Sequence, residues 1–426
     1  MNYRTDAKFA AEMDQSDPLA DYRHKFHIPR HKDGEEIYLC GNSLGLQPKI
    51  TERYVREELE DWARLAVKGH FAGRRPWMPY HELFSERTAR LVGAEPQEVV
   101  NMNSLTVNLH FMLVSFYRPT AARHRILIEP SAFPSDRYAA ASQIRFHGFD
   151  PDVSLVELAP SAGHRGLDMD EVEAVIRSEG ERLALVLLPG VQYYSGQAFD
   201  MARLTRAAHA VGAVAGFDLA HAAGNLPLQL HDWDVDFAVW CNYKYMNAGP
   251  GAVAGCFVHA RHAHAFMLPR FAGWWGHDKA TRFRMQPEFV PMPGAEGWQV
   301  SNPPILALAP LLASLEVLDA AGMARLREKS LRLTGYLEFL LDERLAEAVE
   351  IITPRNPAER GCQLSLRITG TRSRAKEIFT RLEQAGVTAD WREPDVLRVA
   401  PVPLYNSYTD VFRFVEKLTQ ILSTAC

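Results

Sequence analysis

The chain has 426 residues, of which 47% are hydrophobic and 23% charged, and its formal net charge is −5. This is an ordinary globular composition of mixed charge, so nothing in it points to a nucleic-acid or membrane partner. Charged residues interrupt every apolar run before it reaches the length of a membrane span. At roughly 100–200 residues per domain, we expect two domains.

The cysteines and the N-terminus indicate a cellular compartment. The five cysteines are widely spaced, their number is odd and they form no CxxC motif, which argues against a disulfide framework. The first residues, MNYRTDAKFAAEMDQSD, are polar and lack the apolar core of a signal peptide. We therefore expect a cytoplasmic protein.

The sixteen histidines are scattered along the chain. Clusters such as His259, His262 and His264 lack a matching set of carboxylates or thiols. Surface or helix-face positions explain such histidines better than a metal site does, so we expect no metal.

The first clear element is an amphipathic helix over residues 51–68. Val55, Leu59, Trp62 and Ala66 recur at spacings of four, three and four, which is the period of one helix face. Short apolar runs then alternate with helical patterns, which predicts a mostly parallel sheet covered by helices. The predicted strands cover residues 98–103, 125–129, 183–188, 213–218 and 236–240, and two of the predicted helices run from a capping box at residues 168–171 to residue 180 and over 200–211.

The pattern changes from about residue 302. Long helical stretches over 305–320 and 326–345 lead to strands at 351–353 and 362–368 and to helices at 374–384 and 408–422. We predict an α/β protein with three parts: an N-terminal segment (1–45) that packs with the small domain, a large domain (46–301) and a smaller C-terminal α+β domain (302–426).

Polar groups follow several of the predicted strands. Asp218 ends VAGFD, His221 comes shortly after it, and Lys244 follows DFAVW within CNYKYMNAGPG. NSLT (103–106) and FPSD (133–136) come after two other strands. Because ligands bind outside the carboxyl ends of the strands of parallel α/β sheets, we expect these groups to face one site.

Taken singly, each group has an ordinary explanation. A strand-end aspartate is usually a helix cap, a loop lysine is usually solvated, and a phenylalanine after a strand is usually core. Pyridoxal phosphate, however, requires an amine, an acid for the pyridine nitrogen, a stacking ring and phosphate donors together. Lys244 offers the amine, Asp218 the acid, and the helix that opens at residues 103–107 the phosphate donors.

Longer motifs make a family resemblance specific. They are YLCGNSLGLQP (38–48), GHFAGRRPW (69–77), MNSLTVNL (102–109), FPSD, GFDLAHAAGN (216–225), YKYMNAGPG (243–251), GWWGH (273–277), SNPPI (301–305) and RVAPVPLYNS (398–407). Through them nearly the whole chain resembles the kynureninase family of pyridoxal phosphate enzymes. That resemblance implies the aspartate-aminotransferase-like fold (fold type I), in which a mostly parallel sheet of the seven-stranded type forms the large domain.

The resemblance also implies residue roles. Lys244 would be the Schiff-base lysine, Asp218 the pyridinium partner and Tyr243 a phosphate-binding phenol and general acid/base. Further cofactor contacts would be Leu105, Thr106, Phe133, Pro134, Ser135, Asp136, His221, Trp274 and Asn302, of which Trp274 and Asn302 reach the neighbouring subunit of a homodimer. Arg398 would bind the substrate α-carboxylate, with Ser43, His70 and Asn302 near the aromatic ring.

The implied reaction is hydrolysis of L-kynurenine, or its 3-hydroxy form, to anthranilate, or 3-hydroxyanthranilate, and L-alanine, in tryptophan catabolism and NAD biosynthesis. His70 and Asn302 suggest a preference for the 3-hydroxy substrate. Pro189 departs from the family, because relatives can carry a hydroxyl residue there. The alternatives are another fold-type I enzyme (a cysteine desulfurase or a class V aminotransferase) and a non-catalytic protein of that fold.

Overall fold

A seven-stranded sheet forms the centre of the larger body. The computed structural model describes residues 2–32, 34–160 and 166–424. The strand order is β4-β10-β9-β8-β7-β5-β6, and only β10 runs antiparallel to its neighbours. The bounds are β4 (Val99–Asn101), β5 (Arg125–Ile128), β6 (Leu155–Glu157), β7 (Leu183–Pro189), β8 (Val214–Asp218), β9 (Phe237–Trp240) and β10 (Gly255–Val258). The predicted mostly parallel α/β sheet is confirmed.

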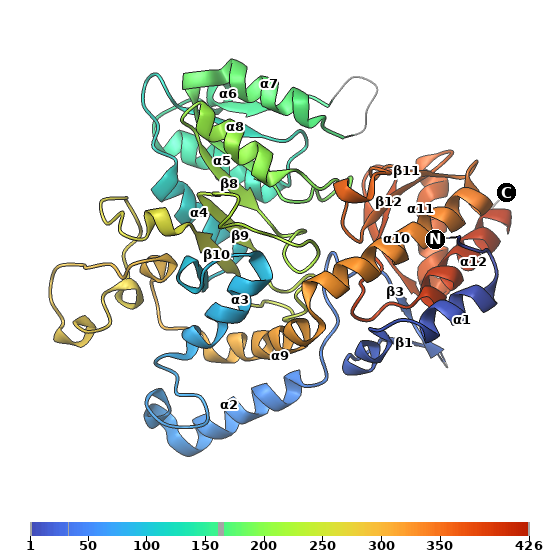
Figure 1. Cartoon of the computed structure of the whole chain (residues 1–426), viewed down its shortest axis with the longest axis horizontal. Coiled ribbons are helices and arrows are strands. Elements are labelled where there is room, and N and C mark those ends of the chain that lie inside the picture. The colour runs from blue at the N-terminus through green and yellow to red at the C-terminus, as the bar shows by residue number, and fades with distance from the viewer. Residues whose placement is uncertain (1, 33, 161–165, 425–426) are drawn as a thin grey trace.

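Helices cover this sheet, which is why its central strands are continuous apolar runs. Every residue of β7, LALVLLP, is buried, as a parallel strand packed on both faces requires. α4 packs against α5, and α7 against α8 (Figure 1). The bounds are α3 (Ser85–Val92), α4 (Leu105–Phe116), α5 (Pro134–Phe146), α6 (Pro151–Ser154), α7 (Met169–Glu179) and α8 (Met201–Ala210).

The smaller body is α+β, as predicted. Its antiparallel sheet has the order β11-β12-β15-β14. The bounds are β11 (Val349–Ile351), β12 (Leu364–Ile368), β14 (Asp390–Arg392), β15 (Val396–Val399), α10 (Met323–Leu345), α11 (Arg372–Gln384) and α12 (Tyr408–Thr424).

The N-terminal segment lies against this smaller body (Figure 1). α1 (Ala7–Gln15) packs on α12, and β3 (Ile37–Tyr38) pairs in parallel with β13 (Val387–Thr388). Phe9, Ile37 and Leu39 share one apolar core with side chains of α10, α11 and α12. Two further strands, β1 (Arg30–His31) and β2 (Gly34–Glu35), form a small hairpin.

The long helix α9 (Ile305–Ala321) lies on the C-terminal side of the predicted boundary at residue 302, yet its buried leucines pack in the core of the larger body. The division at residues 45 and 301 therefore stays a prediction. Within the described residues no single helix is long and apolar enough to cross a membrane; α9 and α10 pass that test only as a pair, and they meet at a bend of 78°.

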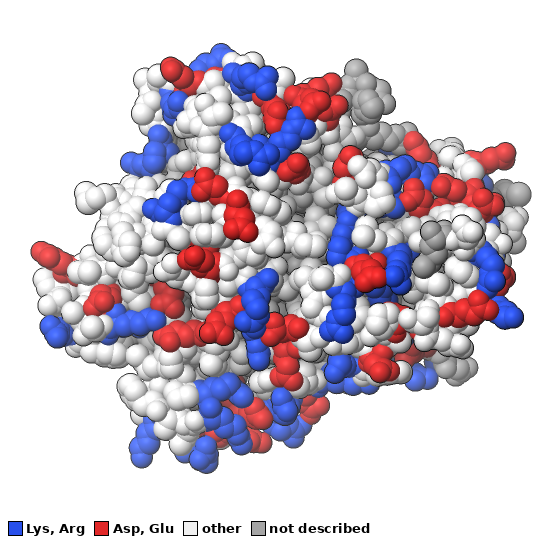
Figure 2. Space-filling model, viewed as in Figure 1, with Lys and Arg blue, Asp and Glu red and all other residues white. Residues whose placement is uncertain are grey.

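Helix α2 (Thr51–Leu65) confirms the predicted helix but turns its apolar face outward. Leu59 is 45% exposed and Trp62 56% exposed, whereas Glu58 is buried. The Glu58 carboxylate accepts hydrogen bonds from Arg75 Nε (2.6 Å) and Trp77 Nε1 (3.0 Å), which fixes the polar face against the molecule. The apolar stripe is thus left uncovered within one chain. Positive and negative side chains are interspersed over the face seen in Figure 2, including along α2.

Candidate active site

Asp218 ends β8 at the carboxyl edge of the large sheet. It pairs with Pro189, the last residue of β7, and its Oδ1 accepts from the backbone N–H of Ala220 at 2.7 Å. Asp218 is 7% exposed, and burial raises the pKa of its carboxyl group, with the hydrogen bond from Ala220 acting in the opposite sense. Both Asp218 and Pro189 line a pocket at this edge.

Lys244 reaches the same pocket from the loop after β9. Its Nζ lies 3.0 Å from Nε2 of His221, which stands three residues beyond Asp218. Burial, and then the charge of Lys244, hold the pKa of His221 well below its usual range, so the ring is neutral. Nδ1 of His221 is buried and has no partner among the described residues.

The GNSLG motif (41–45) contacts the loop that carries Lys244. The N–H of Gly45 donates to the carbonyl of Tyr243 at 2.8 Å. A Cβ at Gly45 would lie 2.3 Å from the carbonyl oxygen of Lys244 and 2.3 Å from Oδ1 of Asn247, so only glycine fits this close approach. Two motifs some 200 positions apart in the sequence thus form one structural unit.

Two helix N-termini open onto the pocket. α4 begins after Ser104, whose side chain makes no capping hydrogen bond, and its first residues Leu105 and Thr106 line the cavity. α5 begins at Pro134, directly after Phe133, and likewise has no side-chain cap. Unsatisfied N–H groups and aligned peptide dipoles at such ends attract a phosphate.

Three buried carboxyl groups line this pocket, and one of them, Glu129, was not predicted from the sequence. Glu129 directly follows β5, and burial, and then the charge of Asp218, raise its pKa to about 8. Burial and the charges of Asp218 and Glu129 raise the pKa of Asp136 well above its usual range, and Oδ1 of Asp136 has no partner among the described residues. Lys244 and the neutral His221 are the basic side chains among the described residues that line the pocket.

This excess of buried carboxyl groups over basic side chains fits pyridoxal phosphate. A protonated pyridine nitrogen beside Asp218 and Asp136 would supply the missing positive charge, and the two helix ends would receive the phosphate. Lys244 would supply an amine for the aldehyde. Phe133 is 39% exposed and so keeps a free ring face for stacking, while its other contact is edge-to-face with Tyr193 at 5.2 Å.

Arg398 stands next to this pocket on β15. Its side chain is fully buried, and Nη1 donates to the carbonyl of Tyr193 (2.7 Å) while Nη2 donates to Asp390 (2.6 Å). Nε is buried without a partner among the described residues, so one N–H group of the guanidinium remains for a carboxylate. Burial lowers the pKa of Arg398, and Asp390 acts in the opposite sense.

Ser43 belongs to the GNSLG turn, where it is half-buried. The neighbouring Asn42 donates to Gln363 at 3.0 Å, and Gln363 donates to the Tyr193 carbonyl at 3.1 Å. The turn is therefore linked to the same carbonyl that Arg398 binds. Like Glu129, the residues Tyr193, Gln363 and Asp390 were not predicted from the sequence.

Three predicted site residues lie outside the pocket around Lys244. His70 packs edge-to-face on Trp77 at 5.5 Å, Trp274 is 41% exposed beside Phe283, and Asn302 is exposed before α9. None of the three lines the pocket around Lys244. The other predicted cofactor residues line it, with the exception of Pro134, which lies between two lining residues. The lining residues are Leu105, Thr106, Phe133, Ser135, Asp136, Asp218, His221, Tyr243 and Lys244. Their roles stay predictions.

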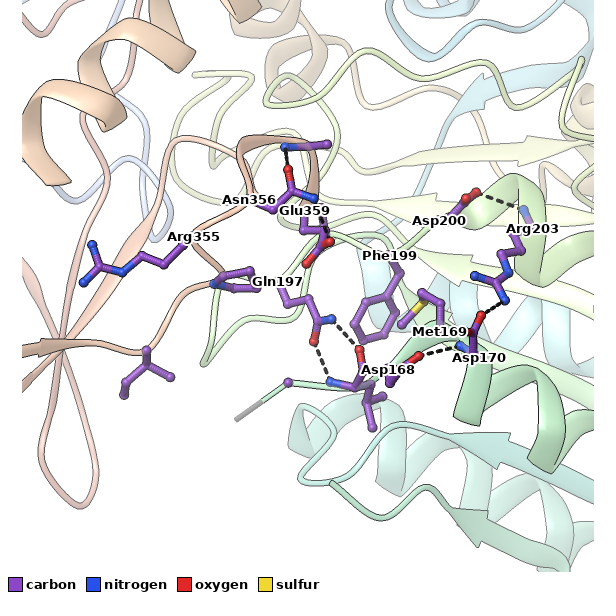
Figure 3. A pocket seen from close by; sticks show the side chains of 16 residues that line it. Asp168, Met169, Asp170, Gln197, Phe199, Asp200, Arg203, Arg355, Asn356 and Glu359 are labelled. Carbon is purple, nitrogen blue, oxygen red and sulfur yellow. Dashed lines mark hydrogen bonds and ion pairs between the residues drawn. The ribbon is translucent and has the colours of Figure 1, made fainter. Parts of the chain in front are cut away.

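A cavity of about 770 Å³ is a separate crevice between the two bodies (Figure 3). Its charged side chains are already paired: Arg203 contacts Asp170, and Arg355 contacts Glu338 and Asp342. Gln197 bonds both backbone groups of Leu167. The arginines and the glutamine of this crevice are therefore already bound to other groups of the chain.

The expectation that the histidine cluster lacks carboxylates was wrong. His262 Nε2 lies 2.8 Å from Asp236, and His259 Nδ1 lies 3.8 Å from Glu98, because the fold returns distant acids to these histidines. Glu98 could join His231 and His259 as ligands, but Oε1 of Glu98 already accepts from the N–H of Ala260 (2.6 Å). The His231 and His259 rings are stacked at 8°, so one metal cannot lie in both ring planes.

Comparison with known proteins identifies the family. The family model of the kynureninase C-terminal domain matches residues 326–418. The kynureninase of Koribacter versatilis is 59% identical over 423 residues, which cover 99% of each chain, and that of Myxococcus xanthus is 59% identical over 411 residues, which cover 96% of each.

Solved structures share the fold at low identity. A mutant of C-DES with glycine covalently linked to its PLP cofactor matches 93% of this chain and 98% of its own, with a TM-score of 0.77 and 16% identity. The cysteine desulfurase CsdA from Escherichia coli matches 95% and 98%, with a TM-score of 0.76 and 18% identity. At such identities these matches support the fold-type I architecture and not the desulfurase alternative. The chain belongs to the kynureninase family.

Proposed function

We propose that this protein is a kynureninase that hydrolyses the Cβ–Cγ bond of L-kynurenine or 3-hydroxy-L-kynurenine, with pyridoxal phosphate bound covalently to Lys244. The products would be anthranilate or 3-hydroxyanthranilate and L-alanine. The 59% identity to a kynureninase over 99% of both chains carries this proposal. The pocket supports it with an amine, buried carboxyls and two helix ends in one place.

The bound cofactor would supply an electron-withdrawing ring that stabilises negative charge developing on the substrate. Asp218 would hold the proton on the ring nitrogen, and Phe133 would stack on the ring. Lys244 would take the proton from the substrate Cα, with His221 at 3.0 Å ready to hold its amine in place. Arg398 would receive the α-carboxylate on its free Nε edge.

Hydrolysis adds hydroxide to the γ-carbonyl carbon and a proton to Cβ. Tyr243 is the candidate for delivering that proton: its phenol lines the pocket next to Lys244. Burial, and then the nearby Cys241, raise the pKa of Tyr243 above its usual value, which keeps the phenol protonated and able to donate.

Release of anthranilate is the direct test. Purified protein with added pyridoxal phosphate should generate anthranilate fluorescence from L-kynurenine and no sulfide from L-cysteine. Sulfide production without anthranilate would favour the cysteine desulfurase alternative. Failure of borohydride to fix the cofactor to the chain would instead favour a non-catalytic protein of this fold.

We further propose a homodimer in which each chain completes the other's site. The support is the position of Trp274 and Asn302, exposed and outside the chain's own pocket. The uncovered apolar face of α2 adds to it: Trp62 is 56% exposed and, with Trp77, Ile305 and Leu306, lines an apolar groove. A second copy would cover this groove.

A cytoplasmic location is also proposed. Cys40, Cys241, Cys256 and Cys362 are all free thiols, which suits a reducing compartment. The fifth cysteine, Cys426, lies outside the described residues.

A further inference from the structure

Asp390 stands directly opposite Arg398 on the small-domain sheet. The two residues are register partners on β14 and β15, and Asp390 Oδ2 accepts from Arg398 Nη2 at 2.6 Å. The Asp390 side chain is 9% exposed and that of Arg398 is fully buried. A charged pair so well shielded from water is strong and directional, because little solvent screens it.

The pair leaves the Nε–H group of the guanidinium without a partner among the described residues. Nη2 is bound to Asp390 and Nη1 to the Tyr193 carbonyl (2.7 Å), while Nε has no partner among the described residues. A carboxylate bound by arginine prefers two parallel N–H groups, so the angle of the guanidinium plane decides whether it is received well.

Asp390 also separates two arginines. Arg392 places Nε 3.0 Å from Asp390 Oδ1 and Nη2 3.1 Å from Oδ2, and the positive charge of Arg392 opposes that of Arg398. Without the negative charge between them, Arg398 would keep only a neutral carbonyl as its acceptor and would face an unshielded like charge.

We propose that Asp390 is a positioning residue that aims Arg398 at the α-carboxylate of the substrate and thereby sets substrate affinity. The proposal rests on the proposed function, in which Arg398 binds that carboxylate. Asp390 could also weaken substrate binding by competition, since Asp390 and the substrate carboxylate both attract Arg398. If competition dominated, removing the Asp390 charge would tighten binding.

The test is Asp390→Asn, which keeps the size and removes the charge. We expect the KM for L-kynurenine to rise about tenfold or more and kcat to change less than about threefold, since an affinity loss shared by ground and transition states appears in KM. Asp395→Asn is the matched control. It breaks another ion pair at the same sheet, between Asp395 in the turn that joins β14 to β15 and Arg367 Nε of β12 at 3.1 Å, away from the pocket.

A binding measurement separates this proposal from the proposed function. Calorimetric titration of the cofactor-loaded protein with L-alanine requires no turnover, and Asp390→Asn should weaken L-alanine binding about as much as it raises KM. Binding of 2-aminoacetophenone, which has the aryl ketone but no α-carboxylate, should not change. If L-alanine binds normally to the variant, the positioning role is wrong even when kynurenine is a good substrate.

Other outcomes also decide the matter. A lower KM in Asp390→Asn would establish competition in place of positioning, and an equal loss in Asp395→Asn would reduce Asp390 to a general structural role. Should Asp390→Asn fail to fold, Asp390→Glu keeps the charge but shifts it by one methylene. Its KM should rise with the melting temperature unchanged, and an unaltered KM there would overturn the proposal.

Discussion

Nζ of Lys244 lies 3.0 Å from Nε2 of His221, and the two side chains come from loops after adjacent strands of the large sheet. Because burial keeps His221 neutral, the imidazole hydrogen-bonds the amine and does not repel it. The contact holds the amine over the edge of the sheet where Asp218 also points, so the lysine is fixed at the pocket and not left as a solvated loop residue.

Replacing Lys244 should abolish covalent cofactor attachment. In Lys244→Ala, borohydride treatment followed by peptide mass mapping should find no pyridoxyl group on the chain, whereas the natural protein should carry it on the Lys244 peptide. Anthranilate release should fall by at least about a thousandfold, because both the attachment point and the proton acceptor are lost. Cofactor fixed to another lysine, together with full activity, would contradict the assignment.

Replacing Asp218 should weaken cofactor binding. Removing one partner of a buried charge pair leaves the other uncompensated, at a cost of about 3–5 kcal/mol. Asp218→Ala should therefore raise the dissociation constant for pyridoxal phosphate by at least about a hundredfold in equilibrium dialysis. The control is Asp200→Ala. Asp200 lies outside the pocket and caps α8 by accepting from the N–H of Arg203. Unchanged affinity in Asp218→Ala would remove this residue from the site.

Much of the fold follows from the sequence because buried parallel strands are continuous apolar runs. β5, β7, β8 and β9 were predicted to within a residue or two at each end. β6 and β10 were missed. β6 is a three-residue edge strand with the half-polar sequence LVE, and β10 is a short antiparallel strand behind a glycine-rich loop. Neither leaves a periodic signal long enough to detect.

The site was only partly predictable for a different reason. Strand-end positions identified Lys244 and Asp218, but the Arg398–Tyr193 contact joins a side chain to a backbone carbonyl 205 residues away. Such a contact leaves no trace in residue type. The apolar stripe of α2 was predicted from its period, but its exposure was not: Leu59 and Trp62 are exposed, and periodicity cannot separate a chain's own core from a surface covered by another chain.

Glu129 should make the cofactor-free protein less stable as the pH rises. Its pKa is about 8 in the folded chain and 4.5 for an ordinary glutamate, so between these values the folded state holds a proton that the unfolded state has lost. Stability is then fully present below about pH 4.5 and is lost as pH approaches 8, by an amount on the order of a few kcal/mol. Urea denaturation of the apoprotein at several pH values measures this slope.

Glu129→Gln should flatten that slope and stabilise the apoprotein at pH 8 by about 2 kcal/mol. Asp136 and Asp218 keep part of the slope, since their pKa values are raised as well. Glu52→Gln, at the start of α2 and paired with Arg56 at the surface, should leave the slope unchanged. Identical slopes in the natural protein and Glu129→Gln would show that Glu129 is ionised when folded.

Shared sites in a homodimer predict complementation between two inactive variants. Lys244→Ala and Trp274→Ala chains, unfolded and refolded together, should form mixed dimers in which one site has both residues. With random pairing, about a quarter of the natural activity should return. Mixing Lys244→Ala with Asp218→Ala is the control: both residues line the same pocket of one chain, so every site stays damaged. No recovery in the first mixture would place Trp274 outside the partner's site.

The last prediction concerns the substrate's ring hydroxyl. His70 packs on Trp77, and Asn302 precedes the Pro304–Ile305 step; Trp77, Pro304 and Ile305 line one groove, so the fold gathers the two segments on one face. Both side chains can hydrogen-bond a hydroxyl. A site built for that bond leaves buried polar groups unpaired when the hydroxyl is absent, which costs roughly 1–3 kcal/mol.

We therefore expect kcat/KM for 3-hydroxykynurenine to exceed that for kynurenine by roughly ten- to a hundredfold. The double variant His70→Trp, Asn302→Thr should bring the ratio close to one, by losing activity on the 3-hydroxy substrate. Lys68→Ala, Ser301→Ala alters exposed positions close in sequence to both residues and should preserve the ratio. Equal handling of the two substrates by the natural enzyme, or a ratio untouched by the His70 and Asn302 changes, would mean that other residues face the ring hydroxyl, since a lost hydrogen-bond partner must appear in kcat/KM for the substrate that used it.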